Sequence, residues 1–303
     1  MSELVNFDSY RAPAPPTAFS AAEIRLEDFI DLDEFPIHDL ASPKRQSLVD
    51  QCRADLEAFG CSHVPRFIKE SAIQAMLEEA NRLMKDARPA DDFVNPYLTP
   101  DDPSLPDDHP KRFFENRTSA FINSDLIESH SLLRKIYDSD VVVHFVADCL
   151  NNGPVYRWAD PLGRCPYSVM RTGDYFPWHY DGNEFTVSIL VQAAEKGGDF
   201  EYVPNLRTPH SENFDAVSKV LRGDRERLRV LKLREGDLQL FKGRYSMHRV
   251  TPTEGATTRI IALPTYVTNP YLVNRPHHAK AFYGRAEPIH HEREMDRSDK
   301  LTD

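Results

Sequence analysis

Residues 178–192 decide the fold, and they read WHYDGNEFTVSILVQ. The stretch places a histidine and an aspartate two residues apart, at His179 and Asp181, and follows them with an apolar run over 185–192. Successive side chains of a strand point to opposite faces, so residues i and i+2 point to the same side. One imidazole and one carboxylate can therefore reach a single ion without a bend in the chain.

Short strands are predicted throughout the chain after residue 153. Segments rich in β-branched and aromatic residues alternate there with Gly, Pro and Asp, which is the pattern of strands separated by turns. The predicted strands cover 167–171, 185–192, 199–203, 228–233, 237–241, 247–250 and 258–267. Many short strands with such turns indicate a sandwich or a jelly roll.

The preceding part of the chain is predicted to be mainly helical. Ser42 is a plausible N-cap with Pro43 at the first helical position, and Gly60 is placed to end that helix. A second helix is predicted from Ser71, with Gln74 completing a capping box.

Four further segments complete this outline. Residues 124–150 carry a helical pattern of apolar side chains, and 211–226 fit a polar helical insert. A short strand is predicted near Ile37. Residues 89–110 are rich in proline and Asp-Asp pairs and are predicted to be a loop, which would be either a lid over a site or a surface insert.

We therefore expect one α+β domain over residues 1–303, in which N-terminal helices pack against a β core. Its predicted parts are an extended arm at 1–41, a mainly helical part at 42–153 with the loop 89–110, a jelly-roll core at 154–275 and a surface tail at 276–303.

Composition narrows the classes of function. The formal net charge is −11, and phosphate recognition needs clustered Lys and Arg, so no nucleic-acid partner is expected. We see no apolar run long enough for a membrane span and no secretory signal. The four cysteines form no CxxC pair, which favours reduced thiols and a cytoplasmic protein.

A third metal ligand is predicted from a different strand, at His248. Two histidines and one carboxylate on one face of a metal leave three coordination positions open, the arrangement of iron(II) oxygenases. A His-x-Asp pair by itself is weak, because about one is expected by chance in this composition. Two similar pairs, His210 with Glu212 and His290 with Glu292, lie in the polar insert and the charged tail, without flanking strands.

The order of the surrounding residues strengthens the metal hypothesis. A strand ends at Arg171-Thr-Gly173 before the pair, and Gly197-Gly198 follows the apolar strand. His248 comes next, and Arg259 lies eleven residues later on the final predicted strand. A guanidinium there can bind a carboxylate with two parallel hydrogen bonds, which a lysine cannot do.

These residues resemble the 2-oxoglutarate/iron(II) dioxygenase superfamily over about residues 150–270. The resemblance implies a double-stranded β-helix, a form of jelly roll, in which His179, Asp181 and His248 bind iron(II). It also implies that Arg259 binds the far carboxylate of 2-oxoglutarate and that O2 is the oxidant. The enzyme would then be a hydroxylase.

A narrower resemblance concerns the stretch Trp178–Phe185 and the stretch Gly198–Pro204. Both are similar to the branch that contains free-amino-acid halogenases and their hydroxylating relatives. The halogenases have a small residue in place of the carboxylate ligand, which opens a chloride site. Asp181 departs from that pattern and matches the hydroxylating one.

The substrate is expected to be a small polar molecule, such as a free amino acid or a close derivative. Arg171, Glu184 and Arg117 are candidates to bind its charged groups, although surface ion pairs would account for them as well. Tyr167 is a candidate to hydrogen-bond the co-substrate, and its alternative is a packed aromatic. The oligomeric state is left open.

The sequence leaves two other functions open. The same chemistry on a protein side chain or a larger natural product would need an open groove. A non-catalytic, cupin-like metal-binding or sensor protein would not need Arg259 to face the metal.

Overall fold

The computed structural model describes residues 24–90, 92–294, 299, 301 and 302. The first part of the predicted arm, 1–23, lies outside the described residues. The strand predicted near Ile37 is wrong, because Ile37 lies in a turn. Its side chain is buried and its carbonyl accepts a hydrogen bond from Arg45 Nε at 3.0 Å, which ties the turn to a helix instead of a sheet.

Helix α2 (Pro43–Phe59) forms as predicted. The Ser42 hydroxyl accepts from the backbone N–H of Arg45, and Gly60 ends the helix in the left-handed conformation, with φ at 66°. Helix α3 (Glu70–Leu83) begins one residue before the predicted start at Ser71, and Lys69 is its N-cap. The capping box expected at Ser71 is therefore wrong, since the Lys69 carbonyl already accepts from the first-turn amides.

The region predicted as one helix at 124–150 is divided. Ser139 ends one helix and its hydroxyl caps the next by accepting from Val142 N. The remaining helices are α1 (Leu26–Phe29), α4 (Leu132–Asp138), α5 (Asp140–Leu150), α6 (Phe214–Leu221), α7 (Pro276–Tyr283) and α8 (Pro288–Glu292), with short 3₁₀ turns at Met84–Asp86, Pro110–Arg112 and Ser124–Leu126.

The strands form a double-stranded β-helix core of two sheets. The larger sheet has the order β1-β13-β9-β16-β7-β5-β2, and the smaller has the order β12-β11-β14-β8. The larger sheet contains β1 (Cys61–Val64), β2 (Arg88–Pro89), β5 (Ala120–Ile122), β7 (Tyr167–Met170), β9 (Thr186–Gln192), β13 (Leu238–Phe241) and β16 (Arg259–Ala262). The smaller contains β8 (Phe176–His179), β11 (Phe200–Val203), β12 (Arg229–Leu231) and β14 (Met247–Val250). Two-stranded ribbons add β3 (Asp92–Val94) with β4 (Glu115–Arg117), β6 (Tyr156–Arg157) with β17 (Tyr266–Val267), and β10 (Lys196–Gly197) with β15 (Thr253–Glu254).

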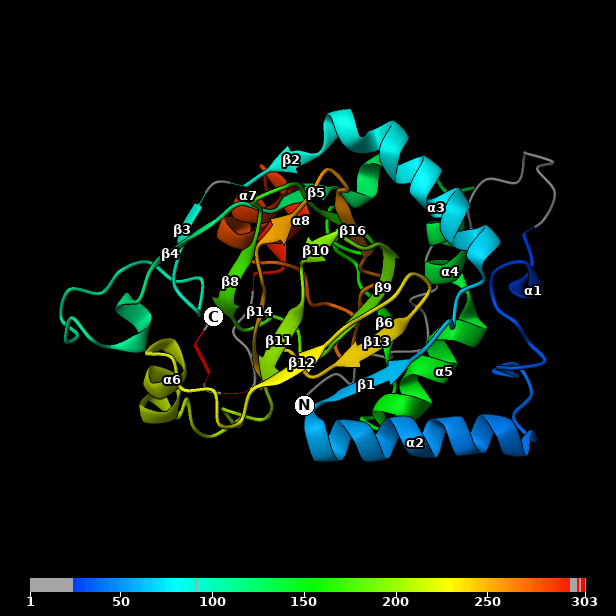
Figure 1. The fold of residues 1–303 in the computed structure, drawn as a ribbon, viewed down its shortest axis with the longest axis horizontal. Coiled ribbons are helices and arrows are strands. Elements are labelled where there is room, and N and C mark those ends of the chain that lie inside the picture. The colour runs from blue at the N-terminus through cyan, green and yellow to red at the C-terminus, as the bar shows by residue number, and fades with distance from the viewer. Residues whose placement is uncertain (1–23, 91, 295–298, 300, 303) are drawn as a thin grey trace, which may run out of the picture.

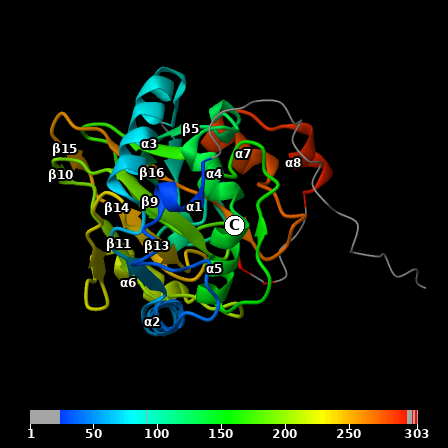
Figure 2. The same ribbon diagram turned by 90° about the vertical axis from the view of Figure 1, so that its right-hand side faces the viewer.

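The N-terminal helices cover one face of the larger sheet. Figures 1 and 2 show α2, α3, α4 and α5 gathered on one side of the molecule, beside β9, β13 and β1. Their apolar faces join those strands in one large hydrophobic cluster. Strand β9 is buried along most of its length by this arrangement, which explains why apolar residues outnumber the polar Thr186 and Ser188 in its central part.

The segment after residue 275 differs from the predicted surface tail. It forms α7 and α8, and the side chains of His278 and His290 are buried. His290 Nε2 lies 3.0 Å from the buried Asp160 carboxylate, which anchors α8 to the loop before β7.

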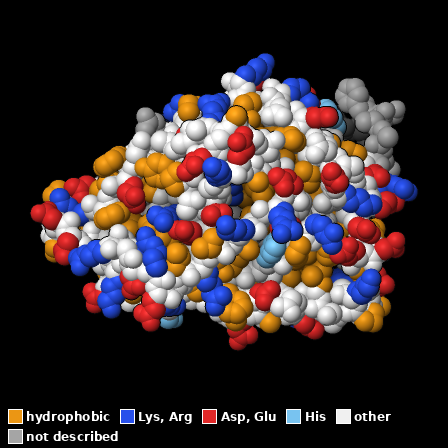
Figure 3. Space-filling view, viewed as in Figure 1, with side chains coloured by type: hydrophobic (Ala, Val, Ile, Leu, Met, Phe, Trp, Pro, Cys, Tyr) orange, Lys and Arg blue, Asp and Glu red, His pale blue; other side chains and the backbone are white. Residues whose placement is uncertain are grey.

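On the face shown in Figure 3, acidic and basic side chains are interspersed. All four cysteines are buried free thiols. Among the helices of the described residues, none is long and apolar enough to cross a lipid bilayer.

Candidate active site

His179, Asp181 and His248 meet at one end of the smaller sheet. Strands β8 and β14 are antiparallel neighbours whose register places His179 opposite His248. His248 Nε2 lies 3.4 Å from Asp181 Oδ1, and His179 Nε2 lies 3.8 Å from the same oxygen. One ligand atom from each residue lies within 4.8 Å of the others, so a single ion can contact all three.

Both histidines present Nε2 to the shared point. His179 Nδ1 lies 2.8 Å from the Pro177 carbonyl, and His248 Nδ1 lies 3.0 Å from the Ser246 carbonyl. Each Nδ1–H therefore donates to the backbone, which fixes the tautomer and leaves the Nε2 lone pair for a metal. Burial, and then the nearby His248 ring, lower the pKa of His179 to about 3, so its imidazole is neutral at pH 7, as ligation requires.

Asp181 lies just beyond the end of β8 and is held by two hydrogen bonds. Its amide donates to the Gly243 carbonyl at 3.1 Å, and Thr186 Oγ1 donates to Oδ2 at 2.6 Å, which leaves Oδ1 toward the histidines. A Cβ at position 243 would overlap Asp181 Oδ2, so glycine is needed there for the carboxylate to fit. Burial raises the pKa of Asp181, but the two histidines and the Thr186 hydroxyl outweigh it and keep the pKa below its usual range.

The donor set fits iron(II). Two imidazoles and one carboxylate oxygen, oriented by hydrogen bonds to their other atoms, form one face of a coordination sphere and leave the opposite positions open.

Replacing Thr186 by Val removes the hydrogen bond to Asp181 Oδ2 while keeping the branched shape. Because outer partners of metal ligands typically contribute about 10–100-fold to metal affinity, the iron(II) dissociation constant is expected to rise by roughly that factor. Anaerobic chelator competition measures it. The control is Thr257→Val, whose hydroxyl donates to the exposed Glu195 at 3.1 Å, outside the cavity. Equal affinities in the two variants would contradict the role of Thr186.

Arg259, on β16, supplies an isolated cation to the same cavity. Its side chain is 4% exposed, and among the described residues no carboxylate lies within 4.0 Å of it. Burial lowers the pKa of Arg259 to about 10, only partly opposed by the charge of Asp199, and the guanidinium stays charged at neutral pH. Gly198 makes room for it, because a Cβ there would lie 2.7 Å from Arg259 Cδ. Arg259 Nη1 donates to Met170 Sδ at 4.0 Å, but a buried cation without an anionic partner is costly, so this position fits the carboxylate of a co-substrate such as 2-oxoglutarate.

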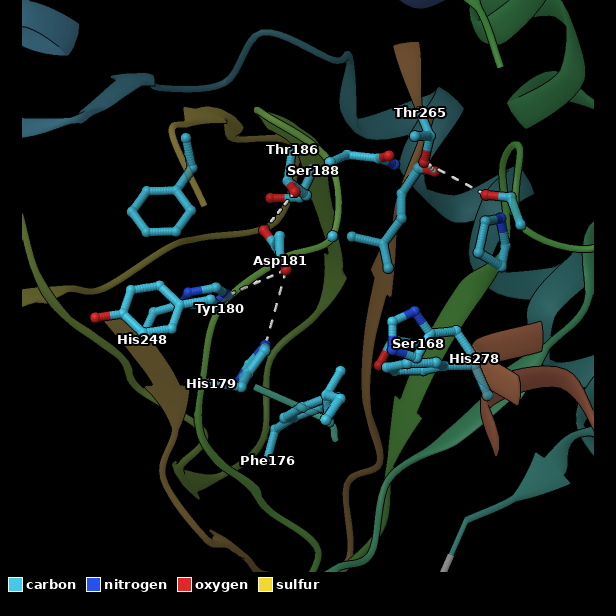
Figure 4. A pocket seen from close by; sticks show the side chains of 18 of the residues that line it. Ser168, Phe176, His179, Tyr180, Asp181, Thr186, Ser188, His248, Thr265 and His278 are labelled. Carbon is cyan, nitrogen blue, oxygen red and sulfur yellow. Dashed lines mark hydrogen bonds and ion pairs between the residues drawn. The ribbon is translucent and has the colours of Figure 1, made fainter. Parts of the chain in front are cut away.

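A cavity of about 200 Å³ joins these groups. The iron-side wall carries the three ligands with the rings of Phe176, Phe200 and Phe241. Figure 4 shows Ser168, Thr265 and His278 on the opposite side. The cavity therefore has aromatic rings near the metal and polar side chains across from it.

The remaining candidate residues do not line this cavity. Tyr167 points into the main hydrophobic cluster and donates to Glu79 Oε1 at 2.9 Å, so its hydroxyl is directed away from the cavity. Arg171 is exposed beyond the end of β7. Glu184 accepts from Asn152 Nδ2 at 2.6 Å and lies 3.5 Å from the Thr268 hydroxyl.

Arg117 is buried behind the cavity wall. Its guanidinium carbon lies 4.2 Å from the ring centre of Phe282 and 5.4 Å from that of Phe176, and both rings line the cavity. One of its nitrogens pairs with Asp92 at 2.6 Å. Arg117 therefore supports the wall and does not contact the cavity itself.

Four residues of the site were not predicted from the sequence: Thr186, Gly243, Ser168 and Thr265. Thr186 and Ser188 interrupt the apolar run of β9 at alternate positions, and this pattern was the available signal for polar groups that face the metal. The role of Gly243 had no local signal, because it depends on a side chain 62 residues away in the sequence that only the fold brings near.

Comparisons with known proteins found one family model and several solved structures that are similar to this chain. A family model described as Halogenase D matches residues 44–281. A solved structure of AviO1 from Streptomyces viridochromogenes is 17% identical, with a TM-score of 0.50, over 78% of this chain and all of the other. The non-haem, alpha-ketoglutarate-dependent carbocyclase SnoK from nogalamycin biosynthesis is 13% identical, with a TM-score of 0.52, over 73% of this chain and 85% of the other. No curated protein sequence matches the chain.

Proposed function

Because the chain belongs to the Halogenase D family, within the iron(II)- and 2-oxoglutarate-dependent oxygenases, we propose that it hydroxylates an unactivated C–H bond of a small polar substrate. A free amino acid or a close derivative is the substrate class that we favour. The enzyme uses iron(II), 2-oxoglutarate and O2.

The observation that carries hydroxylation over halogenation is the carboxylate of Asp181. Halogenases that this chain resembles have a small residue at that position, which leaves room for chloride. Here the Asp181 carboxylate occupies the position, and the Thr186 hydroxyl holds it at 2.6 Å. His179, Asp181 and His248 would all hold the metal, so the Asp181 carboxylate would fill the place that a halide needs.

When bound, iron(II) and 2-oxoglutarate supply the oxidising power for attack on the C–H bond. The chain's own residues bind and orient. In this proposal His179, Asp181 and His248 hold the metal, and Arg259 binds the far carboxylate of the co-substrate. Phe176, Phe200 and Phe241 exclude water around the metal.

The cavity supports a small substrate. Its volume of about 200 Å³ lies below the roughly 300–1,000 Å³ common for drug-sized ligands, which favours a small substrate over a large natural product. Ser168 and Thr265, opposite the metal, offer neutral hydrogen-bonding groups.

The charge of the cavity narrows the substrate class further. Among the described residues that line it, Asp181 is the only carboxylate. The ammonium group of a substrate would thus have no ion pair with Glu184, which lies outside the cavity, and would contact uncharged oxygens instead. This favours derivatives in which the nitrogen is uncharged over the free amino acid.

The test is to incubate the iron-loaded enzyme and 2-oxoglutarate with amino acids and their N-acyl and amide derivatives, with chloride present. We expect a product heavier by one oxygen, together with stimulated succinate formation. A chlorinated product would replace hydroxylation by halogenation. Activity only on a peptide or a large natural product would overturn the small-substrate proposal. Absence of succinate under every condition would favour the non-catalytic alternative.

A further inference from the structure

We propose that Asp299 acts through Arg244 as a positioning residue for the iron ligand Asp181, and that Thr302 forms part of the active-site wall. Asp299, Leu301 and Thr302 are here called the tail contacts. The proposal concerns iron binding and does not depend on which substrate is oxidised.

The first observation is a buried ion pair that reaches across the fold. Arg244 donates through Nε to Asp299 Oδ2 at 2.5 Å and through Nη2 to Asp299 Oδ1 at 2.6 Å. The two side chains are only 3% and 12% exposed. Two parallel charge-assisted bonds of this kind fix the orientation of the guanidinium as well as its position.

The second observation connects this pair to the metal site. The remaining arm of Arg244, Nη1, donates to the carbonyl of Gly182 at 3.2 Å, and Gly182 directly follows Asp181. The neighbouring Gly243 carbonyl accepts from the Asp181 amide at 3.1 Å. Gly243 therefore binds the Asp181 amide, and Arg244 binds the carbonyl of the next residue, Gly182. Asp299 keeps Arg244 in the orientation that its hydrogen bond to Gly182 requires.

The third observation places Thr302, one of the tail contacts, at the cavity itself. Thr302 lines the cavity together with Gly182, Asn183 and Arg207. Its carbonyl accepts from Arg207 Nη1 at 3.1 Å, and its amide donates to Glu212. Leu301 is 7% exposed, so this part of the chain is packed and not merely laid over the surface.

These contacts have a common consequence. Arg244 and Arg207 are both buried, and each directs hydrogen bonds to the tail contacts. Without these contacts, both guanidinium groups would lose partners that replace water, and the turn after Asp181 would lose its outer support.

The experiment compares Asp299→Asn with the wild type in the full chain, using iron(II) alone as the probe. The variant keeps the shape of the side chain but removes its charge. We expect the iron(II) dissociation constant to rise by about 10-fold, the low end of the range for outer partners, since Asp299 acts through Arg244. Hydrogen exchange of the peptide containing the Asp181 amide should be faster in the variant.

Two further variants make the test specific. Asp125→Asn is the matched control, because Asp125 pairs with Arg285 at 2.6 Å on the surface, and it should leave the iron affinity unchanged. Arg244→Lys keeps the charge but cannot form the two parallel bonds, and it should weaken iron binding at least as much as Asp299→Asn. The double variant should bind iron no more weakly than Arg244→Lys, because the two residues act in series.

Two results would overturn the proposal. One is a lower melting temperature of Asp299→Asn with an unchanged iron(II) dissociation constant and unchanged exchange at Asp181, which would show a purely structural pair. The other is additive loss of iron affinity in the double variant, which would show that Asp299 does not act through Arg244. If Asp299→Asn does not fold, the iron(II) dissociation constant and the hydrogen exchange at the Asp181 amide are measured in Arg244→Lys. Unchanged values of both would then overturn the proposal.

Discussion

Replacement of His179, Asp181 or His248 by Ala is expected to abolish 2-oxoglutarate turnover and to weaken iron(II) binding by more than about 100-fold. The factor follows because loss of a single outer partner already costs about 10–100-fold, and a ligand contributes more than its support. Since all three donor atoms converge within 4.8 Å, no one of them is peripheral. Iron content after anaerobic loading and succinate formation are the measurements.

Circular dichroism shows whether each variant still folds, and a variant of a histidine outside the site serves as the control. His63 is also paired with an aspartate, Asp237 at 2.7 Å, but it lies on β1 outside the cavity. His63→Ala should keep its iron and its turnover. Full turnover in the Ala variant of any one of the three ligands would remove that residue from the metal site.

Arg259→Ala is expected to raise the apparent KM for 2-oxoglutarate by about 10–150-fold. A hydrogen bond to a charged group contributes about 1.5–3 kcal/mol, and every 1.4 kcal/mol is tenfold in affinity. The buried position of Arg259 favours the upper part of the range, because water replaces its contact poorly there. The KM for the oxidised substrate should change little, which distinguishes a co-substrate ligand from a substrate ligand.

Two variants accompany this measurement. Arg259→Lys keeps the charge and should recover only part of the affinity, since an ammonium cannot form the two parallel bonds. Arg171→Ala is the control, because its exposed side chain lies outside the cavity and its loss should leave both constants unchanged. An unchanged KM for 2-oxoglutarate in Arg259→Ala would refute the assignment.

The sequence predicted the core of the fold because its strands carry their pattern locally. The apolar run of β9 and the helix signals at Ser42 and Gly60 depend on neighbours in the chain, and they appear in the structure where they were expected. The pairing of His179 with His248 was also accessible, since the two strands that carry them each have a clear pattern.

The substrate-facing residues could not be predicted in the same way. Arg171 and Glu184 are close to His179 in sequence, but proximity along a strand does not set where a side chain points once the strand has ended. Glu184 lies in the turn after Asp181 and bonds Asn152, while Thr265 comes from a distant segment and faces the metal across the cavity. Tyr167 was misplaced because the face of β7 it occupies is fixed by packing against α3, where Glu79 accepts its hydroxyl.

Because Gly243 has no side chain, the residues that can occur at positions 181 and 243 depend on each other. The space taken by Asp181 Oδ2 is the space that any Cβ at 243 would need. A carboxylate at 181 therefore requires glycine at 243, whereas a relative with a small residue at 181 is released from that requirement. Among relatives, a side chain at 243 should occur only in chains that have given up the carboxylate. Reading position 243 would then help to distinguish oxygen-transferring from halide-accepting members of the family when the ligand position itself is hard to align.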